Sequence, residues 1–359
     1  FEPAQWAEVT KQAGMKYMIF TTKHHDGFCM FDSQYTDFSI SRCAFKEHPK
    51  ADVAKYVFEA FRKEGFMTGA YFSKPDWHNQ DYFATPNRNV NYKIERHPEK
   101  WEAFKTYTHN QIGELMSNYG TIDILWLDGG WVSPRNNQDI DMPQIAAMAR
   151  AKQPGLLVVD RTIHGKYENY QTPEQKIPEH QLPYPWESCV TLTTDWGWVK
   201  NPVYKTPNRI ISILMEVVAK GGNLLLGVGP TAEGLIEQPT VKRLQEIGRW
   251  MQKNGKAIYH TRITPNYHCG NVWFTADKNG RTLYALYALP EGETLPAVIE
   301  WEGNVPERGT SVRLLSTGQR MKWIERDGKV AVTLPAKLAG STEPIALQFD
   351  TPLPKQNKK

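Results

Sequence analysis

Side chains that could do chemistry follow several short apolar runs in the first 260 residues. His24 and His25 follow the run at 16–20, Asp128 ends the run at 123–128, and Arg161 follows the run at 156–160. A carboxylate of this kind can act as a nucleophile or a base, and a neighbouring arginine would lower its pKa. If the runs are strands of one parallel sheet, these groups meet at its carboxyl edge, where barrels of this class carry their sites.

Asp128 is the most informative of these residues. It lies between Trp126 and Trp131 and is followed by Gly129 and Gly130. A carboxylate at the end of an apolar strand is costly to bury unless it has a partner or a task. Glycines beside it would let a ligand approach the backbone closely. The alternative is an Asp that caps the next helix.

His24 and His25 allow two interpretations. Histidines are common metal ligands, but no HxH or HExxH spacing accompanies the pair. Adjacent residues on a strand also point to opposite faces, so both reach one cleft only if the backbone twists. The pattern favours histidines that bind sugar hydroxyls over metal ligands, and a structural role stays open.

The remaining polar and aromatic residues suggest the class of reaction. Lys74, Asp76 and Trp77 follow the run at 67–73. Glu168, Glu174 and Glu179 lie on a long loop, and Glu187 lies in the next apolar segment. Glycoside hydrolysis needs two carboxylates in different environments, groups for hydroxyls and an apolar face for the ring. Five tryptophans, Trp77, Trp126, Trp131, Trp196 and Trp198, could supply that face, and core packing explains at least two of them.

The order of apolar runs and amphipathic segments predicts the fold. Strands are expected at 16–20, 67–73, 123–128, 156–160 and 223–229, with helices at 52–64, 98–118, 207–220 and 239–254. Near-continuously apolar strands that alternate with helices indicate a parallel sheet covered on both faces, and this number of units favours a (β/α) barrel over residues 1–262. Residues 263–359 read as an antiparallel β-sandwich, with a type I′ hairpin at Asn279-Gly280 and a second hairpin at Asp327-Gly328.

Composition excludes several other classes of protein. The chain has 359 residues, 40% of them apolar and 23% charged, which fits about two globular domains. Its formal net charge of +4 is too small and dispersed to indicate nucleic-acid binding. No apolar run reaches the length of a membrane span, and no signal peptide is visible. Four cysteines without a CxxC pair favour buried free thiols, with one disulfide as the alternative. Neither a metal nor a cofactor is expected.

Several motifs together resemble the α-L-fucosidases of glycoside hydrolase family 29. They are TTKHHDGF, WLDGGW, Val159-Asp160-Arg161, TPEQ, WESC with WGW, and KGGNLLLGVGPTAEGLI, in order between about residues 5 and 260. The resemblance implies retaining exo-hydrolysis of terminal α-L-fucose from a fucosylated oligosaccharide or glycoconjugate. It also implies a secreted, periplasmic or lysosomal location. It leaves the linkage and the oligomeric state open.

The resemblance also implies a role for each matching residue. Asp128 is the nucleophile, and Glu174 of the TPEQ motif is the first choice for the acid/base, with Glu187 as the alternative. The two carboxyl groups of a retaining enzyme are expected about 5–5.5 Å apart. The substrate-binding residues are His24, His25, Tyr71, Trp77, Trp126, Arg161 and Trp196.

One family feature does not occur in the printed sequence. The family opens its barrel with a strand that bears a further sugar-binding His in a motif like F-G-x-F-x-H-W-G, whereas this sequence starts at the helix that follows. We expect that strand to lie outside the printed chain. Two other functions stay open: a glycosidase of this scaffold that acts on modified, for example sulfated, fucose, and a non-catalytic fucose-binding protein.

Overall fold

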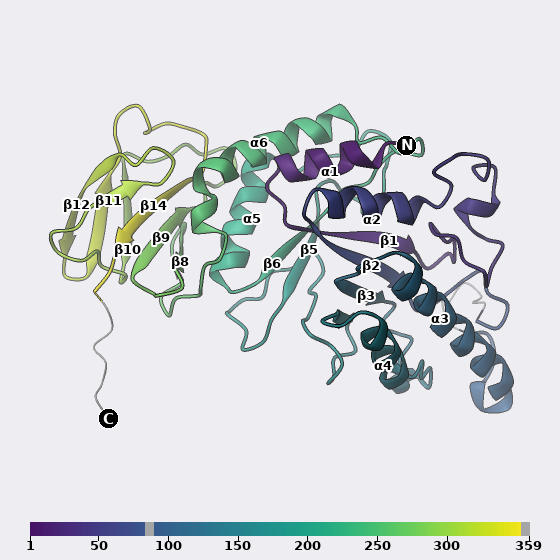
Figure 1. Ribbon diagram of the computed structural model, residues 1–359. Helices are drawn as coiled ribbons and strands as arrows, with labels where there is room; N and C mark the ends of the chain where they lie inside the picture. Colours follow the sequence, from purple (N-terminus) through teal and green to yellow (C-terminus); the bar gives the residue numbers. More distant parts are fainter. Residues whose placement is uncertain (83–89, 353–359) are drawn as a thin grey trace, which may run out of the picture. The chain divides into compact units, whose positions relative to one another are not determined.

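The computed structural model describes residues 1–82 and 90–352, and Figure 1 labels its helices and strands. Contacts divide the chain into two compact units, which we describe separately. Unit 1 comprises residues 1–11 and 15–172, and unit 2 comprises residues 12–14 and those from 173 onward. The boundary at residues 262 and 263, where the sequence changes from an α/β to an antiparallel pattern, stays a prediction.

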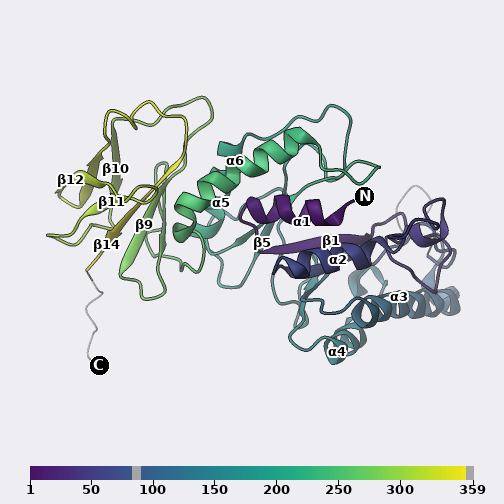
Figure 2. The same ribbon diagram turned by 45° about the horizontal axis from the view of Figure 1, so that its top comes forward.

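Unit 1 is built on a sheet of four parallel strands. These are β1 (Tyr17–Lys23), β2 (Met67–Ser73), β3 (Ile124–Asp128) and β4 (Leu157–Asp160), in that spatial order. The helices are α1 (Pro3–Gln12), α2 (Val53–Lys63), α3 (Pro98–Asn118) and α4 (Met142–Lys152), and α3 packs beside α4 in both ribbon views (Figures 1 and 2). Three 3-10 turns lie at Ile40–Arg42, Ile94–Arg96 and Pro134–Asn136. The predicted alternation of strands and helices is confirmed here.

The two faces of this sheet have different roles. In the parallel register, Tyr71 pairs with Trp126 and Ser73 with Asp128, so these four residues share one face. The alternating residues on the other face are fully buried and belong to the core of unit 1; they are Ala70, Phe72, Leu125, Leu127 and Val158. One face therefore holds the unit together, and the other is left for polar groups.

Helix α4 has no counterpart among the predicted helices. It begins after Asp141, whose side chain accepts a hydrogen bond from the amide of Gln144, as an N-cap does. Its buried face consists of only Ile145, Ala146 and Ala149. Two alanines and one isoleucine make too weak an apolar stripe to stand out in the sequence.

Unit 2 begins with a pair of parallel strands, β5 (Glu187–Thr191) and β6 (Asn223–Gly227). Helix α5 (Pro207–Ala219) connects them, and α6 (Gln238–Asn254) follows β6 and continues into a 3-10 turn at Gly255–Ala257. Helix α5 packs against β6, and α6 packs on α5 (Figure 1). Helix α5 starts at Pro207, where the Thr206 hydroxyl accepts a bond from the amide of Arg209.

The rest of unit 2 is one antiparallel sheet of eight strands, in the order β10-β13-β12-β11-β14-β9-β8-β7. The strands are β7 (His268–Cys269), β8 (Val272–Ala276), β9 (Thr282–Tyr287), β10 (Val298–Glu302), β11 (Val312–Leu314), β12 (Arg320–Arg326), β13 (Lys329–Thr333) and β14 (Ile345–Asp350). Trp301 of β10, at one end of this order, contacts Phe274 of β8 near the other end, with ring centroids 5.9 Å apart. The sheet therefore folds over its own core, as the predicted β-sandwich requires.

The two predicted hairpins differ in outcome. Asp327 and Gly328 have φ of 50° and 79° and form a two-residue loop between β12 and β13, as a type I′ turn requires. The type I′ prediction at Asn279-Gly280 is wrong, because only Gly280 has a positive φ. The Asp277 carboxylate accepts bonds from the amides of Arg281 and Thr282 and so stabilises a wider loop.

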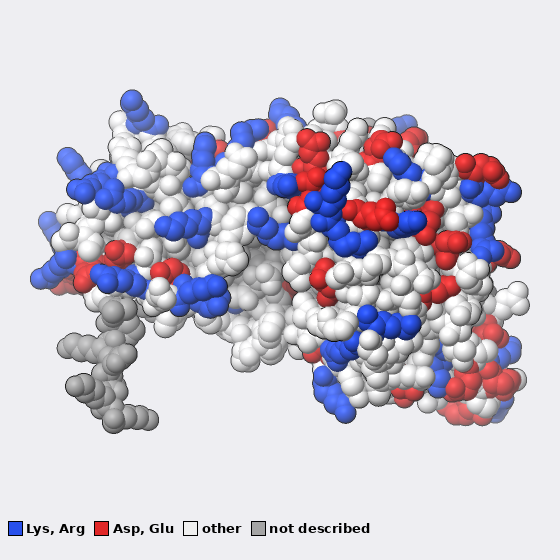
Figure 3. Space-filling model, viewed as in Figure 1, with Lys and Arg blue, Asp and Glu red and all other residues white. Residues whose placement is uncertain are grey.

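The surface carries charges of both signs. On the face drawn in Figure 3, lysine and arginine side chains are interspersed with aspartate and glutamate. All four cysteines, Cys29, Cys43, Cys189 and Cys269, are free thiols, as predicted. Within residues 1–82 and 90–352, no helix is both long enough and apolar enough to cross a membrane.

Candidate active site

Asp128 ends β3 at the carboxyl edge of the unit 1 sheet and is only 9% exposed. Three donors hold its carboxylate. The Tyr71 hydroxyl donates to Oδ2 over 2.7 Å, the Gly129 amide donates to Oδ1 over 2.7 Å, and Arg161 Nη1 lies 3.1 Å from Oδ1. Because both oxygens are bound, the carboxylate has a fixed orientation.

These contacts set the protonation state of Asp128. Burial by itself raises the pKa of the carboxyl, but the positive charge of Arg161 and the hydrogen bonds from Tyr71 and Gly129 outweigh it. The pKa of Asp128 therefore lies below its usual value, and the group is ionised at neutral pH. The same environment raises the pKa of Tyr71, through burial first and the Asp128 charge second, so the phenol keeps its proton and donates.

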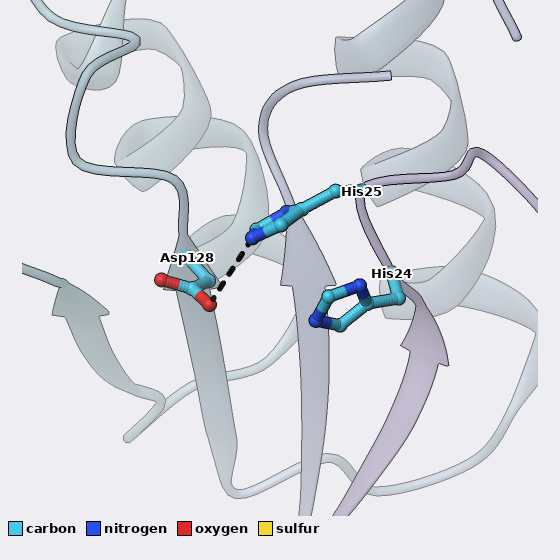
Figure 4. A group of neighbouring side chains, drawn as sticks. All are labelled: His24, His25 and Asp128. Atoms are coloured by element: carbon cyan, nitrogen blue, oxygen red, sulfur yellow. Dashed lines mark ion pairs between the residues drawn. The ribbon is translucent and has the colours of Figure 1, made fainter. Parts of the chain in front are cut away.

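His24 and His25 come together beside this carboxylate (Figure 4). They lie after the end of β1, in a turn in which the Gly27 amide donates to the His24 carbonyl, and their rings are 4.1 Å apart. His25 Nε2 lies 3.9 Å from Oδ2 of Asp128, and His25 Nδ1 shares a hydrogen bond of 2.5 Å with the Ser73 hydroxyl. The turn thus brings both rings beside the Asp128 carboxylate, which two residues of a regular strand could not do.

The two histidines are suited to binding neutral hydroxyls. Burial lowers the pKa of His24, and the charges of Asp128 and Asp26 offset this only in part. His24 is therefore neutral at physiological pH and offers one donor and one acceptor. His24 also stacks on Tyr71, with centroids 5.7 Å apart.

Aromatic rings pack around these polar groups. Trp126, which is 3% exposed, stacks on Tyr71 at 5.3 Å, and the Arg161 guanidinium lies 5.3 Å above the Trp126 ring. Trp77 and Trp131 both contact His25, at centroid distances of 5.4 and 5.0 Å. These tryptophans pack against the binding groups, so their rings orient the polar side chains of the pocket.

Gly129 explains part of the DGG motif. Its φ is +85°, and a Cβ at this position would lie 2.1 Å from Cδ of Pro75. The loops after β2 and β3 therefore touch at a place where no side chain fits. This contact keeps the Gly129 amide aimed at the Asp128 carboxylate.

Two buried ion pairs lie near the carboxyl ends of the strands. Lys74 Nζ lies 2.6 Å from Asp160 Oδ1, and Lys23 Nζ lies 3.0 Å from Asp76 Oδ2. The Lys74 amide also donates to the Asp128 carbonyl, and Asp160 directly precedes Arg161. Lys74 and Asp76, which follow the apolar run at 67–73, are thus fully buried and paired. Lys23 and Ser73 were missed; their only signal was a polar residue at the end of an apolar strand.

Glu168 lies on the loop after β4, with its side chain 4% exposed. One of its oxygens lies 3.1 Å from Nδ1 of His164. Burial raises its pKa, as does the charge of Asp160, whereas His164 and Lys74 lower it, and the net direction is upward. This carboxyl is therefore buried between His164 of its own loop and the Lys74–Asp160 pair.

Glu174 and Trp196 meet in unit 2. The indole Nε1 of Trp196 donates to Glu174 Oε1 over 2.8 Å, and Trp196 is 42% exposed. The neighbouring Gln175 donates from its side-chain amide to the hydroxyl of Thr191, the last residue of β5. Glu174 is exposed, and its backbone pairs with Cys189 in the middle of β5, while Gln175 reaches the carboxyl end of the strand.

Glu187 has a different environment. It is the first residue of β5, is 2% exposed and pairs in register with Asn223, the first residue of β6. At about 3.3 Å per residue, it lies about 13 Å along the strand from Thr191. It thus occupies the amino end of the strand pair, whereas the functional groups of parallel barrels lie at the carboxyl end.

The donor set His24, His25 and Asp128 could also hold a cation, since one ligand atom of each lies within 4.8 Å of the others. Arg161 already neutralises Asp128 at 3.1 Å, and His25 Nδ1 is bonded to Ser73. A metal ion would have to displace the guanidinium or share the carboxylate with it. The groups fit hydroxyl binding better, and the absence of a metal cofactor stays a prediction.

The structure thus gathers six of the predicted residues in unit 1 at one place, five of them around the carboxylate of the sixth, Asp128. The six are His24, His25, Tyr71, Trp126, Asp128 and Arg161, with Trp77 behind His25. In unit 2 it joins exposed Glu174 to Trp196, whereas Glu187 is buried at the amino end of β5.

Known proteins are similar to this chain in both sequence and fold. The α-L-fucosidase family model matches residues 1–256. The plasma α-L-fucosidase of Homo sapiens is 30% identical over 359 residues, which cover 93% of this chain and 72% of that protein. The solved α-L-fucosidase isoenzyme 1 of Paenibacillus thiaminolyticus superposes with a TM-score of 0.82 at 30% identity, covering 98% of this chain and 86% of that one.

A second solved structure bears on the reaction. It is a family 29 α-L-fucosidase of Bacteroides thetaiotaomicron, trapped as a covalent intermediate with 2-fluoro-fucosyl fluoride. It superposes with a TM-score of 0.82 at 25% identity, covering 97% of this chain and 82% of that one. The α/β fold with parallel strands, followed by the antiparallel β-sandwich, is confirmed by these neighbours. With the family model spanning most of its length, the chain belongs to the α-L-fucosidases of glycoside hydrolase family 29.

Proposed function

We propose that this chain is a retaining exo-α-L-fucosidase in which Asp128 is the nucleophile. One observation carries the proposal: Asp128 is buried yet ionised, fixed by Tyr71, Gly129 and Arg161, with His24 and His25 beside it. A nucleophile must stay deprotonated and oriented toward the anomeric carbon, and this environment provides both.

The reaction then has two steps. Asp128 attacks the anomeric carbon while an acid protonates the departing oxygen, which gives a β-fucosyl-enzyme. The residue that acted as the acid then deprotonates a water molecule, which attacks the fucosyl-enzyme. Fucose is released with the configuration that it had in the substrate. His24 and His25 bind hydroxyls of the sugar, Trp126 packs under Tyr71 and Arg161, and Trp77 supports His25.

Glu174 is our choice for the acid/base. It is exposed and accepts a hydrogen bond from Trp196, and its neighbour Gln175 is bonded to Thr191 at the carboxyl end of β5. Glu187 is the alternative, but its burial at the amino end of the same strand argues against it. Trp196, 42% exposed, would pack against the methyl group of fucose.

The other proposed functions have less support. The relatives named above are fucosidases, and the chain retains a buried nucleophile, whereas a pure binding protein has no need of one. Activity on sulfated fucose would call for a basic group beside Trp196, and the partner found there is the carboxylate of Glu174. We further propose a fucosylated oligosaccharide or glycoconjugate as substrate, and a secreted, periplasmic or lysosomal location, by analogy with the plasma enzyme.

Azide rescue of alanine variants tests these roles. Asp128→Ala should lose at least about a hundredfold in turnover of an aryl α-L-fucoside. Added azide should then give β-L-fucosyl azide, because azide replaces the nucleophile. Glu174→Ala with azide should give α-L-fucosyl azide, because azide attacks the covalent intermediate. Rescue of Glu187→Ala in place of Glu174→Ala would reverse the acid/base assignment, and an active Asp128→Ala would refute the proposal.

A further inference from the structure

Two exposed tryptophans follow β5 in unit 2. Trp196 and Trp198 are 42% and 43% exposed, a large fraction for the largest apolar side chain. Both indole N–H groups are bonded to carboxylates: Trp196 Nε1 donates to Glu174, and Trp198 Nε1 donates to Glu237 over 3.0 Å. About two fifths of each residue is therefore exposed, while the polar edge of its indole is fixed by a carboxylate.

This segment is held tightly against the end of β6. A Cβ at Gly227 would lie 2.7 Å from the ring of Trp196, and a Cβ at Gly229 would lie 2.5 Å from the backbone nitrogen of Trp198. The GVG sequence thus allows direct contact between the strand end and the tryptophan segment. Lys205 adds bonds from Nζ to the carbonyls of Thr191 and Thr193. The exposure of the Trp198 ring is consequently a fixed feature and not the result of a loose loop.

The position of Trp198 relative to Glu174 suggests what this ring contacts. The acid of a glycosidase donates its proton to the glycosidic oxygen, which departs with the leaving group. The residue that fucose leaves behind must therefore lie next to the acid. Trp196 joins Glu174 directly, and Trp198 is two residues further along the same fixed segment. Trp198 also lines a pocket together with Tyr204 and Glu237.

We propose that Trp198 forms the leaving-group subsite and that its exposed indole face stacks on the sugar residue to which fucose is attached. A pyranose ring presents an apolar face of C–H groups, which suits an aromatic surface, and the Glu237 carboxylate beside the ring can accept from a sugar hydroxyl. This inference rests on the proposed function, specifically on Glu174 as the acid.

Two substrates with different leaving groups test the subsite. α-L-Fucosyl fluoride has no leaving-group sugar, whereas a fucosyl disaccharide has one. For Trp198→Ala, kcat/KM on the disaccharide should fall at least about tenfold more than kcat/KM on the fluoride. Trp198→Phe should retain most of the disaccharide activity, because it keeps an aromatic face. Equal losses on the two substrates for Trp198→Ala would overturn the proposal.

A matched control separates stacking from general damage. Tyr184, which is 40% exposed and lies before the amino end of β5, has similar exposure but no place in the proposed site. Tyr184→Ala should leave the ratio of the two activities as in the wild type, and a change like that of Trp198→Ala would contradict the subsite.

Glu174→Gln distinguishes a wrong assignment of the acid from a wrong assignment of the subsite. If it keeps full disaccharide activity, the acid assignment is wrong; if it loses that activity while Trp198→Ala shows no substrate preference, only the subsite is wrong.

Discussion

The buried ion pair between Lys74 and Asp160 makes a quantitative prediction about stability. The two charged atoms are 2.6 Å apart, and the side chains are 0% and 8% exposed. Lys74→Met would leave the Asp160 carboxylate buried without its counter-ion. Removing one partner of such a pair typically costs about 3–5 kcal/mol of unfolding free energy. We expect a loss of that size for this variant.

Urea unfolding measures this loss. With a urea dependence of about 2 kcal/mol per M, the transition midpoint of unit 1 should fall by about 2 M. Two further variants sharpen the test. The double variant Lys74→Met with Asp160→Leu removes both charges and should recover most of the loss. Lys329→Met breaks the exposed pair with Glu300, whose side chains are both 52% exposed, and should cost about 1 kcal/mol or less.

Two outcomes would refute this reasoning. The first is that Lys74→Met is no more destabilising than Lys329→Met. The second is that the double variant is as unstable as Lys74→Met. Either result would mean that the burial of the Lys74–Asp160 pair does not determine its contribution to the free energy of unfolding.

Three further predictions concern the pocket and the sandwich. In Arg161→Met, the pKa of Asp128 should rise because the positive charge that lowers it is removed. The acidic limb of the pH profile of kcat/KM should therefore move to higher pH, and an unmoved limb would contradict the electrostatic argument. Gly129→Ala should lower both kcat and the melting temperature, because its methyl group would meet Pro75, and wild-type values for both would show that the loops can separate freely. Trp301→Ala should destabilise the β-sandwich by about 3–5 kcal/mol in urea unfolding followed by circular dichroism, while a loss below about 1 kcal/mol would contradict its place in the core.

The sequence alone was sufficient to predict the groups at the strand ends. Asp128 and Arg161 could be identified because each ends or follows an apolar run, and parallel strands bring such positions to one edge. The pairing of Lys23 with Asp76 could not be predicted, because it joins residues 53 positions apart through side chains that fold into the interior. Long-range pairs of this kind leave no local pattern.

Other differences between prediction and structure arise where a side-chain contact or the strand register overrides a local sequence pattern. The Asn279-Gly280 pair favours a tight turn, but the carboxylate of Asp277 stabilises a wider loop by binding two amides. Glu187 follows a tryptophan in a recognisable motif, and only the strand register places it at the amino end of β5. The choice between Glu174 and Glu187 therefore depends on structure, whereas the choice of Asp128 did not.

The most direct test of the account is the identity of the residue that carries the covalent intermediate. The enzyme would be incubated with 2-fluoro-fucosyl fluoride, digested with trypsin and analysed by tandem mass spectrometry. The peptide from Thr106 to Arg135 contains Glu114, Asp123 and Asp128, and fragmentation separates the three. We predict a single fluorofucosyl group on Asp128. A stable label on any other carboxylate, or hydrolysis of the reagent by an Asp128→Ala variant at the wild-type rate, would contradict the central claim.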